Sequence, residues 1–167
     1  MKKQYRVIAF LSALFLASCG DDMGENMSQL KSKVYKEGPK GRSELVLSFS
    51  GLKSSDGNMC VSVFDEAGDF PSDEGAPVFS GCFEIAALSS GIKVELPAGK
   101  YAAAVFHDEN ANGKLDKKRI FGIKVPKEPF GFSNNPKIKM SAPKFEDCAF
   151  NLGLDSNVAL NIELKKI

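Results

Sequence analysis

The stretch NVALNIEL, residues 157–164, alternates large apolar residues with polar or small ones. Successive side chains of a β-strand point to opposite faces, so Val158, Leu160, Ile162 and Leu164 share one face of an extended chain. Asn157, Ala159, Asn161 and Glu163 share the other face. This period of two predicts an antiparallel strand with one face buried and the other in water.

The rest of residues 44–167 repeats this pattern in shorter pieces. ELVLSFSGL (44–52) and MCVSVFDE (59–66) alternate in the same way, and shorter strand candidates lie at 82–88, 92–99, 100–107, 120–125 and 148–154. Turn-forming sequences separate them, and only residues 83–90 offer a short helix as an alternative. We predict an all-β domain: an antiparallel β-sandwich of about seven or eight strands, immunoglobulin-like or prealbumin-like, with a small barrel as the second architecture.

The N-terminal sequence MKKQYRVIAFLSALFLASCG predicts an export signal. Three basic residues precede an apolar run over 7–17 that is too short to span a bilayer. Leu16-Ala17-Ser18-Cys19 resembles the lipobox of bacterial lipoproteins, in which the cysteine thiol accepts diacylglycerol. The alternative is an ordinary secretory signal with a chance cysteine. We predict a signal peptide over 1–18, the lipidated Cys19 and a flexible tether over 19–43, and one folded domain over 44–167.

Acylation at Cys19 would anchor the protein in a membrane, because each buried methylene contributes about 0.8 kcal/mol to partitioning. Gly20 follows the cysteine, so an aspartate that would retain the protein at the inner membrane is absent from that position. We expect an outer-membrane lipoprotein of the bacterial cell envelope. Asp21 and Asp22 resemble the surface-export tags of some bacterial lipoproteins, but the sequence leaves the periplasmic or outer face open.

The charge of the mature chain speaks against a nucleic-acid partner. Removing residues 1–18 leaves 22 − 3 = 19 basic and 21 acidic side chains, a formal charge of −2. A protein that binds the phosphate backbone of a nucleic acid needs an excess of basic side chains. We therefore expect no nucleic-acid partner.

Three cysteines remain after Cys19: Cys60, Cys82 and Cys148. An oxidising location favours one disulfide and one leftover thiol, although spacing alone does not name the pair. Three buried free cysteines are the alternative, since all three lie beside apolar strand-like residues.

The stretch HDENANGKLD, residues 107–116, contains a candidate calcium loop. Its pattern Asp-x-Asn-x-Asn-Gly-x-Leu-Asp resembles the first nine positions of an EF-hand loop. Side-chain oxygens and one backbone carbonyl can converge there on a hard cation; the candidate ligands are Asp108, Asn110, Asn112, Lys114 (through its carbonyl) and Asp116.

The pattern then departs from a complete EF-hand loop. Arg119 stands where a bidentate glutamate normally closes the shell, so Glu146 or Asp147 would have to complete it. Binding would be weak, at about 10⁻⁴ to 10⁻³ M, and would stiffen the loop rather than catalyse. The alternative is an unmetallated polar turn, since Asn, Asp and Gly stabilise tight turns without an ion.

His107 is the only histidine of the chain. Beside Asp108 it could serve as a general base or a transition-metal ligand. No second histidine and no Cys-x-x-Cys spacing supports a zinc site, and no Gly-x-Ser-x-Gly elbow is present. A structural, hydrogen-bonded histidine is the favoured interpretation.

The segment 126–147 is a long connection of the kind that is often functional. Its aromatic side chains either fold back onto the sandwich, which is favoured, or form a ligand surface. If this segment and the calcium-like loop meet at one end of the sandwich, they form a candidate binding face of His107, Phe130, Phe132, Asn134 and Phe145.

Three motifs together resemble one bacterial family, the secreted domain of unknown function numbered 2141. They are Tyr101-Ala102 with Phe106-His107-Asp108-x-Asn110-x-Asn112-Gly113, Gly131-Phe132-Ser133-Asn134, and Pro143-x-Phe145-Glu146-Asp147. The likeness covers roughly residues 45–164, and Cys148 departs from it where the family more often has a small residue such as alanine. The resemblance implies an exported β domain and no particular reaction.

Three functions follow from these patterns. The first is a non-enzymatic module that presents a loop-built face to a protein, glycan or envelope partner. The second is an envelope hydrolase that uses His107 with Asp108 or Glu146. The third is a structural envelope component whose loop binds calcium incidentally.

Overall fold

The computed structural model describes residues 42–72, 75–139 and 141–166. The predicted signal peptide, the lipobox and Cys19 lie outside these residues. Within them, no helix is long and apolar enough to cross a membrane. The first described strand starts at Arg42, two residues before the predicted start of the domain.

The regular secondary structure of the described residues is almost entirely β-strand. The strands are β1 (Arg42–Ser50), β2 (Asn58–Phe64), β3 (Phe79–Glu84), β4 (Ile92–Pro97), β5 (Gly99–Asp108), β6 (Lys117–Ile120), β7 (Ile123–Pro126), β8 (Phe130–Phe132), β9 (Phe150–Leu152) and β10 (Asn157–Glu163). The helical segments are the short 3₁₀ turn η1 (Ile85–Ala87) and the single-turn helix α1 (Phe145–Cys148). The predicted all-β class is confirmed.

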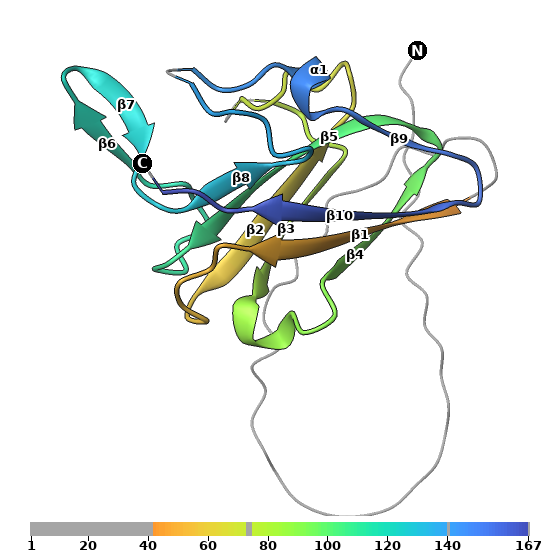
Figure 1. The fold of residues 1–167 in the computed structure, drawn as a ribbon, viewed down its shortest axis with the longest axis horizontal. Helices are drawn as coiled ribbons and strands as arrows, with labels where there is room; N and C mark the ends of the chain where they lie inside the picture. The colour runs from red at the N-terminus through yellow and green to blue at the C-terminus, as the bar shows by residue number, and fades with distance from the viewer. Residues whose placement is uncertain (1–41, 73–74, 140, 167) are drawn as a thin grey trace, which may run out of the picture.

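Two sheets form the predicted sandwich (Figure 1). The smaller sheet has the order β10-β1-β4, and the larger has the order β3-β2-β5-β8 with β9 also paired to β5. These eight strands match the predicted number, while β6 and β7 form a separate hairpin. The interpretation of residues 120–125 as one strand was wrong, because the chain reverses at Phe121 and Gly122.

One pair of strands departs from the predicted antiparallel arrangement. β1 and β10 run parallel, with Leu45 opposite Val158 and Phe49 opposite Ile162. Parallel strands that are consecutive need a long crossover, but the first and last strands of a domain have the whole chain between them. The parallel pair therefore costs no extra connection.

The main core lies between the two sheets. β1 contributes Leu45 and Leu47 and β10 contributes Ile162, all fully buried, as the alternation of these strands predicts. They pack against inward side chains of β2 and β5, which include Met59, Val61, Val63, Tyr101, Ala103 and Val105.

A second core covers the outer face of the larger sheet. Phe130, Phe132 and the Cys148 side chain are buried there with Ala102, and Phe145 packs against them. The Phe70 ring joins this cluster, with its centroid 5.8 Å from that of Phe132. β5 is consequently buried on both faces, which explains why its sequence is a nearly continuous apolar run.

Candidate functional site

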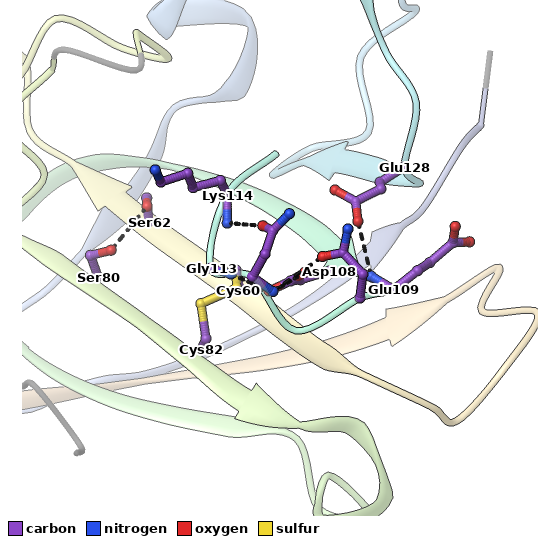
Figure 2. Close-up of a disulfide and its surroundings, with 11 residues drawn as sticks. Cys60, Ser62, Ser80, Cys82, Asp108, Glu109, Gly113, Lys114 and Glu128 are labelled. Atoms are coloured by element: carbon purple, nitrogen blue, oxygen red, sulfur yellow. Dashed lines mark hydrogen bonds between the residues drawn. A yellow bond between two sulfur atoms is a disulfide. The ribbon is translucent and has the colours of Figure 1, made fainter. Parts of the chain in front are cut away.

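A disulfide joins β2 to the neighbouring strand β3 beneath the 108–116 loop (Figure 2). It links Cys60 and Cys82, which lie directly opposite each other in the register of the two strands. Cys148 is a buried free thiol in the second core, and burial raises its pKa to about 12. The prediction of one bridge and one thiol is confirmed, and the structure supplies the pairing.

Asp108 ends β5 and organises the loop that follows. Its side chain is fully buried, and its two carboxylate oxygens accept hydrogen bonds from the backbone N–H groups of Asn112 (3.0 Å) and Gly113 (2.7 Å). The Cys60 Sγ lies 4.0 Å from Oδ2 (Figure 2). A buried carboxylate is tolerated when such donors satisfy it. Asp108 therefore closes the turn.

The other predicted ligands lie close together, but they form hydrogen bonds within the loop. The Oδ1 atoms of Asn110 and Asn112 accept N–H bonds from Asn112 (3.1 Å) and Lys114 (2.8 Å). Their amide groups donate to the two carboxylate oxygens of Asp116, at 3.0 and 3.3 Å. Ala111 and Gly113 have positive φ angles of 56° and 73°, as a tight polar turn requires. Each of these side-chain oxygens already has a protein donor.

Glu128 is the residue of this site that sequence reasoning missed. Its side chain is only 2% exposed, and its two oxygens accept the backbone N–H groups of Glu109 (3.0 Å) and Asp116 (2.9 Å). Figure 2 shows Glu128 beside Glu109. One carboxylate thus holds both ends of the 108–116 loop, an arrangement that we call the Glu128 brace. The available signal was an acidic residue between two prolines, directly before the apolar strand β8.

Glu146 and Asp147 do not complete a calcium shell at this loop, contrary to prediction. Glu146 lies on α1 and binds the Lys100 ammonium at 2.8 Å, near the start of β5. Asp108 is eight residues further along the same strand, or about 26 Å at the usual rise. Asp147 accepts the backbone N–H of Lys144 at the start of α1. Among the described residues, no group of three or more His, Cys, Asp or Glu side chains is placed to hold a metal ion.

His107 faces the main core rather than the loop. Its ring is 1% exposed, and Nε2 lies 2.7 Å from the Asp56 carbonyl oxygen, to which it donates. Nδ1 is buried and has no hydrogen-bond partner. Because consecutive residues of a strand point to opposite faces, the His107 ring and the Asp108 carboxylate lie on opposite sides of the sheet. The acid–base pair of the predicted hydrolase does not form, and Glu146 is too distant to replace Asp108.

The aromatic binding face is also not formed as predicted. Phe130 and Phe132 are 6% and 8% exposed and belong to the second core, where Phe145 packs against them. The favoured alternative, in which these rings fold back onto the sandwich, is what the structure contains. Asn134 is exposed, and its amide donates to the Ala149 carbonyl oxygen at 2.7 Å.

The Gly-Phe-Ser-Asn motif joins the two sheets. A Cβ atom on Gly131 would lie 2.7 Å from the Ile162 side chain, so only glycine lets β8 approach β10 this closely. The Ser133 hydroxyl donates to the Cys148 carbonyl oxygen at 2.6 Å and accepts the Ala103 N–H at 2.9 Å. This motif therefore has a structural explanation.

Two shallow depressions mark the surface of the described residues. An open depression of about 300 Å³ is lined by Ser55, Gly57, Asn58, Glu84, Ala86 and Ala111. A second of about 580 Å³ lies beside it, between β1 and η1, and is lined by serine, glycine and apolar residues. Glu84 is the single titratable side chain lining either depression, so neither presents a pair of acid–base groups.

Comparison with known proteins identifies the family. The family model described as an uncharacterized protein conserved in bacteria (DUF2141) matches residues 47–160, which include the three motifs. No curated protein and no solved structure matches the chain. Because the match covers more than half of the sequence, the chain belongs to the uncharacterised bacterial family DUF2141.

Proposed function

We propose that this protein is a lipid-anchored module of the bacterial cell envelope that binds or supports a partner rather than catalysing a reaction. One observation carries the non-catalytic part. The polar cluster at the end of β5 uses its hydrogen bonds on its own loop, with both carboxylate oxygens of Asp108 and of Glu128 bound to backbone N–H groups. The partner would be a protein or a glycan of the envelope.

The acid–base side chains of this cluster are not accessible to a substrate, which argues against a catalytic role. A general base must come within hydrogen-bond reach of a substrate proton. His107 is buried between the sheets and bound to the Asp56 carbonyl, while Asp108 is buried on the other face. With Glu128, these side chains therefore support a rigid loop, which is what a binding surface needs.

The His107→Gln variant tests this part. Glutamine keeps an N–H donor for the Asp56 carbonyl oxygen and removes the imidazole. We expect this variant, once shown to be folded by circular dichroism, to complement a deletion strain as well as the wild type does. If the variant is folded and correctly located but does not complement the deletion, the result would support the hypothesis of histidine catalysis instead.

The anchor is supported by the N-terminal pattern, a basic start, a short apolar run and Leu16-Ala17-Ser18-Cys19. Its test is palmitate labelling followed by membrane fractionation. Wild-type protein should carry label and sediment with membranes, whereas Cys19→Ser should lose the label. Cys148→Ala is the matched control, because it removes a cysteine without touching the lipobox. Persistent labelling of Cys19→Ser would refute the anchor.

Weak calcium binding at the 108–116 loop is a secondary part of the proposal. Asn110, Asn112 and Asp116 already meet at the exposed side of the loop. A half-turn of each amide would present oxygen instead of nitrogen to the same point, and the ion would then replace the hydrogen bonds that these oxygens accept from the Asn112 and Lys114 N–H groups. These three would hold the ion, with Asp108 and the Lys114 carbonyl completing the predicted set. A bound ion would stiffen the loop, with a dissociation constant of about 10⁻⁴ to 10⁻³ M because few charges face it.

Thermal unfolding tests the calcium site. Millimolar calcium should raise the melting temperature of the wild type relative to chelator, and Asp116→Asn should abolish the rise. Asp155→Asn is the control, because Asp155 is exposed in a different turn and asparagine tolerates its positive φ. Identical melting curves for the wild type with calcium and with chelator would end this part of the proposal.

A further inference from the structure

The β6–β7 hairpin projects from the sandwich as a separate two-stranded sheet (Figure 1). Every residue of β6 is exposed. At the tip, Phe121 is fully exposed and Ile120 is 38% exposed. Among the described residues, the one other exposed large hydrophobic side chain is Leu154, which follows β9 on the body of the domain. Because the Phe121 ring is fully exposed, it contributes no buried contact to the stability of the fold.

The tip is surrounded by positive charge. Residues 114–127, KLDKKRIFGIKVPK, contain six lysine or arginine residues and one aspartate, a formal charge of 6 − 1 = +5. The whole chain has a formal charge of +1, so the remaining residues together carry 1 − 5 = −4. The excess of positive over negative charge is thus concentrated around Phe121.

Two features of the hairpin disfavour it in water. Phe121 and Gly122 have φ angles of 48° and 84°, the two-residue turn at which asparagine and glycine are preferred and a bulky side chain is rare. Arg119 lies directly opposite Lys124, and like charges in that position repel. A surface that is anionic outside and apolar beneath would offset both costs, because anions would screen the paired cations and the exposed ring would leave water.

We propose that the hairpin docks on the surface of an anionic phospholipid bilayer. Phe121 enters the boundary between headgroups and acyl chains, and the surrounding cations contact lipid phosphates. The Glu128 brace fixes the base of the hairpin through the Asp116 N–H, and the Lys127 N–H donates to the Asp116 carbonyl oxygen at 2.8 Å. The tip therefore has a fixed direction relative to the sandwich.

The geometry of the chain permits this docking. The inference rests on the proposed anchor at Cys19, which lies 42 − 19 = 23 residues before β1. That length of chain spans at most about 80 Å. β1 starts at the end of the sandwich away from the hairpin (Figure 1), and this reach exceeds the about 30 Å that the nine residues of β1 span. Because the acylated cysteine would already hold the chain at the bilayer, the hairpin would meet the lipid surface as a tethered second contact.

Tryptophan fluorescence tests the docking, because the protein has no tryptophan. Phe121→Trp and Leu154→Trp each create a single reporter, the first at the tip and the second at an exposed site on the body. Both proteins are reconstituted at full length into vesicles of phosphatidylcholine, with or without phosphatidylglycerol. We expect the emission of Phe121→Trp to shift to shorter wavelength and to be quenched by brominated acyl chains in the anionic vesicles only. Leu154→Trp should show neither effect.

A charge variant tests the electrostatic part. Arg119→Gln with Lys124→Gln removes two cations at the tip, and each cation near an anionic surface strengthens binding about fivefold. We expect about 30-fold weaker partitioning of the non-acylated Cys19→Ser chain into anionic vesicles. Lys53→Gln with Lys139→Gln removes the same charge from exposed sites elsewhere and should leave partitioning within twofold. Equal loss in the two double variants would overturn the proposal.

The same measurements separate this inference from the anchor. If palmitate labelling fails but the tip reporter of Phe121→Trp still responds to anionic vesicles, the anchor is wrong and the docking stands. If the protein is acylated but the emission of Phe121→Trp is the same in both vesicle types, the docking is wrong and the anchor stands. The second result would indicate that the hairpin tip contacts a protein surface rather than a lipid bilayer.

Discussion

Two buried carboxylates, on Asp108 and Glu128, determine the shape of the loop between β5 and β6. Each accepts two backbone N–H groups, so four donors that would otherwise need water are satisfied inside the fold. Hydrogen bonds to charged acceptors are stronger than those to neutral ones. At the scale of single residues, the polar character of this loop therefore serves rigidity.

Glu128→Gln should destabilise the domain by about 2 kcal/mol, because an amide keeps one acceptor and turns a donor toward the second N–H group. Urea unfolding measures the change. Glu84→Gln, an exposed substitution of the same kind on β3, should stay within about 0.5 kcal/mol of the wild type. Equal midpoints for Glu128→Gln and the wild type would show that the brace contributes nothing.

Cys148 should resist alkylation in the native state. Burial raises its pKa to about 12 from an ordinary value of 9.0, so the thiol stays protonated. A raised pKa makes the protonated thiol stabilise the fold below about pH 9, and this contribution declines as pH rises from 9 toward 12. Cys148→Ala should lack that decline in urea unfolding between about pH 8 and pH 11. Rapid reaction of the folded protein with iodoacetamide at about pH 8 would contradict the buried thiol.

The sequence identified the calcium-like loop but not its neighbours. Asp108, Asn110, Asn112 and Asp116 are close in sequence, so local spacing was enough to predict that they meet. Glu128 reaches the loop only because the hairpin returns the chain to the end of β5. The assignment of Glu146 to this loop failed for the same reason, since the positions of Ile138, Phe145 and Cys148 at the second core are set by tertiary packing.

At the scale of elements, strands with one buried face were predictable and strands with other surroundings were less so. β1 and β10 alternate cleanly because one side faces the core. β5 is buried on both sides and lacks that alternation. The β6–β7 hairpin was missed because phenylalanine occupies a turn position where asparagine would have marked the reversal.

The Cys60–Cys82 bridge should contribute about 3 kcal/mol, the value expected for closing a loop of this length in the unfolded chain. The double variant Cys60→Ala with Cys82→Ala should lose that amount in urea unfolding. Ser62→Ala with Ser80→Ala alters the next outward-facing pair on the same two strands and should cost less than about 1 kcal/mol. Mass spectrometry of unreduced protein should find the 60–82 peptide pair linked; a link to Cys148 would contradict the structure.

At the scale of the whole molecule, the larger sheet has a hydrophobic core on each face. The inner core joins it to the smaller sheet, and the outer core joins it to the segments around Phe70 and α1. The sandwich was predictable from strand number and alternation. The return of the aromatic side chains of residues 126–147 onto it was also the favoured interpretation, but the sheet face that they cover was not predictable, because these residues show no period. This second layer absorbs the aromatic side chains that would otherwise have formed an exposed surface.

Ile162→Ala should destabilise the domain by about 2–5 kcal/mol, because the side chain is fully buried and contacts both β8 and the main core. Leu154→Ala removes a comparable side chain that is 62% exposed and should change stability by less than about 0.5 kcal/mol. Calorimetry on both variants provides the measurement. A similar loss for the two would contradict the described packing of β10.

The parallel pairing of β1 with β10 sets the order in which the domain can be completed. Synthesis delivers the amino end first, so β1 must wait for nearly the entire polypeptide before its parallel neighbour exists. Until then one edge of β1 offers unpaired backbone groups to any extended segment nearby. A product cut short before residue 157 would keep that edge exposed for its lifetime, which gives proteases and chaperones a physical mark by which to recognise unfinished copies.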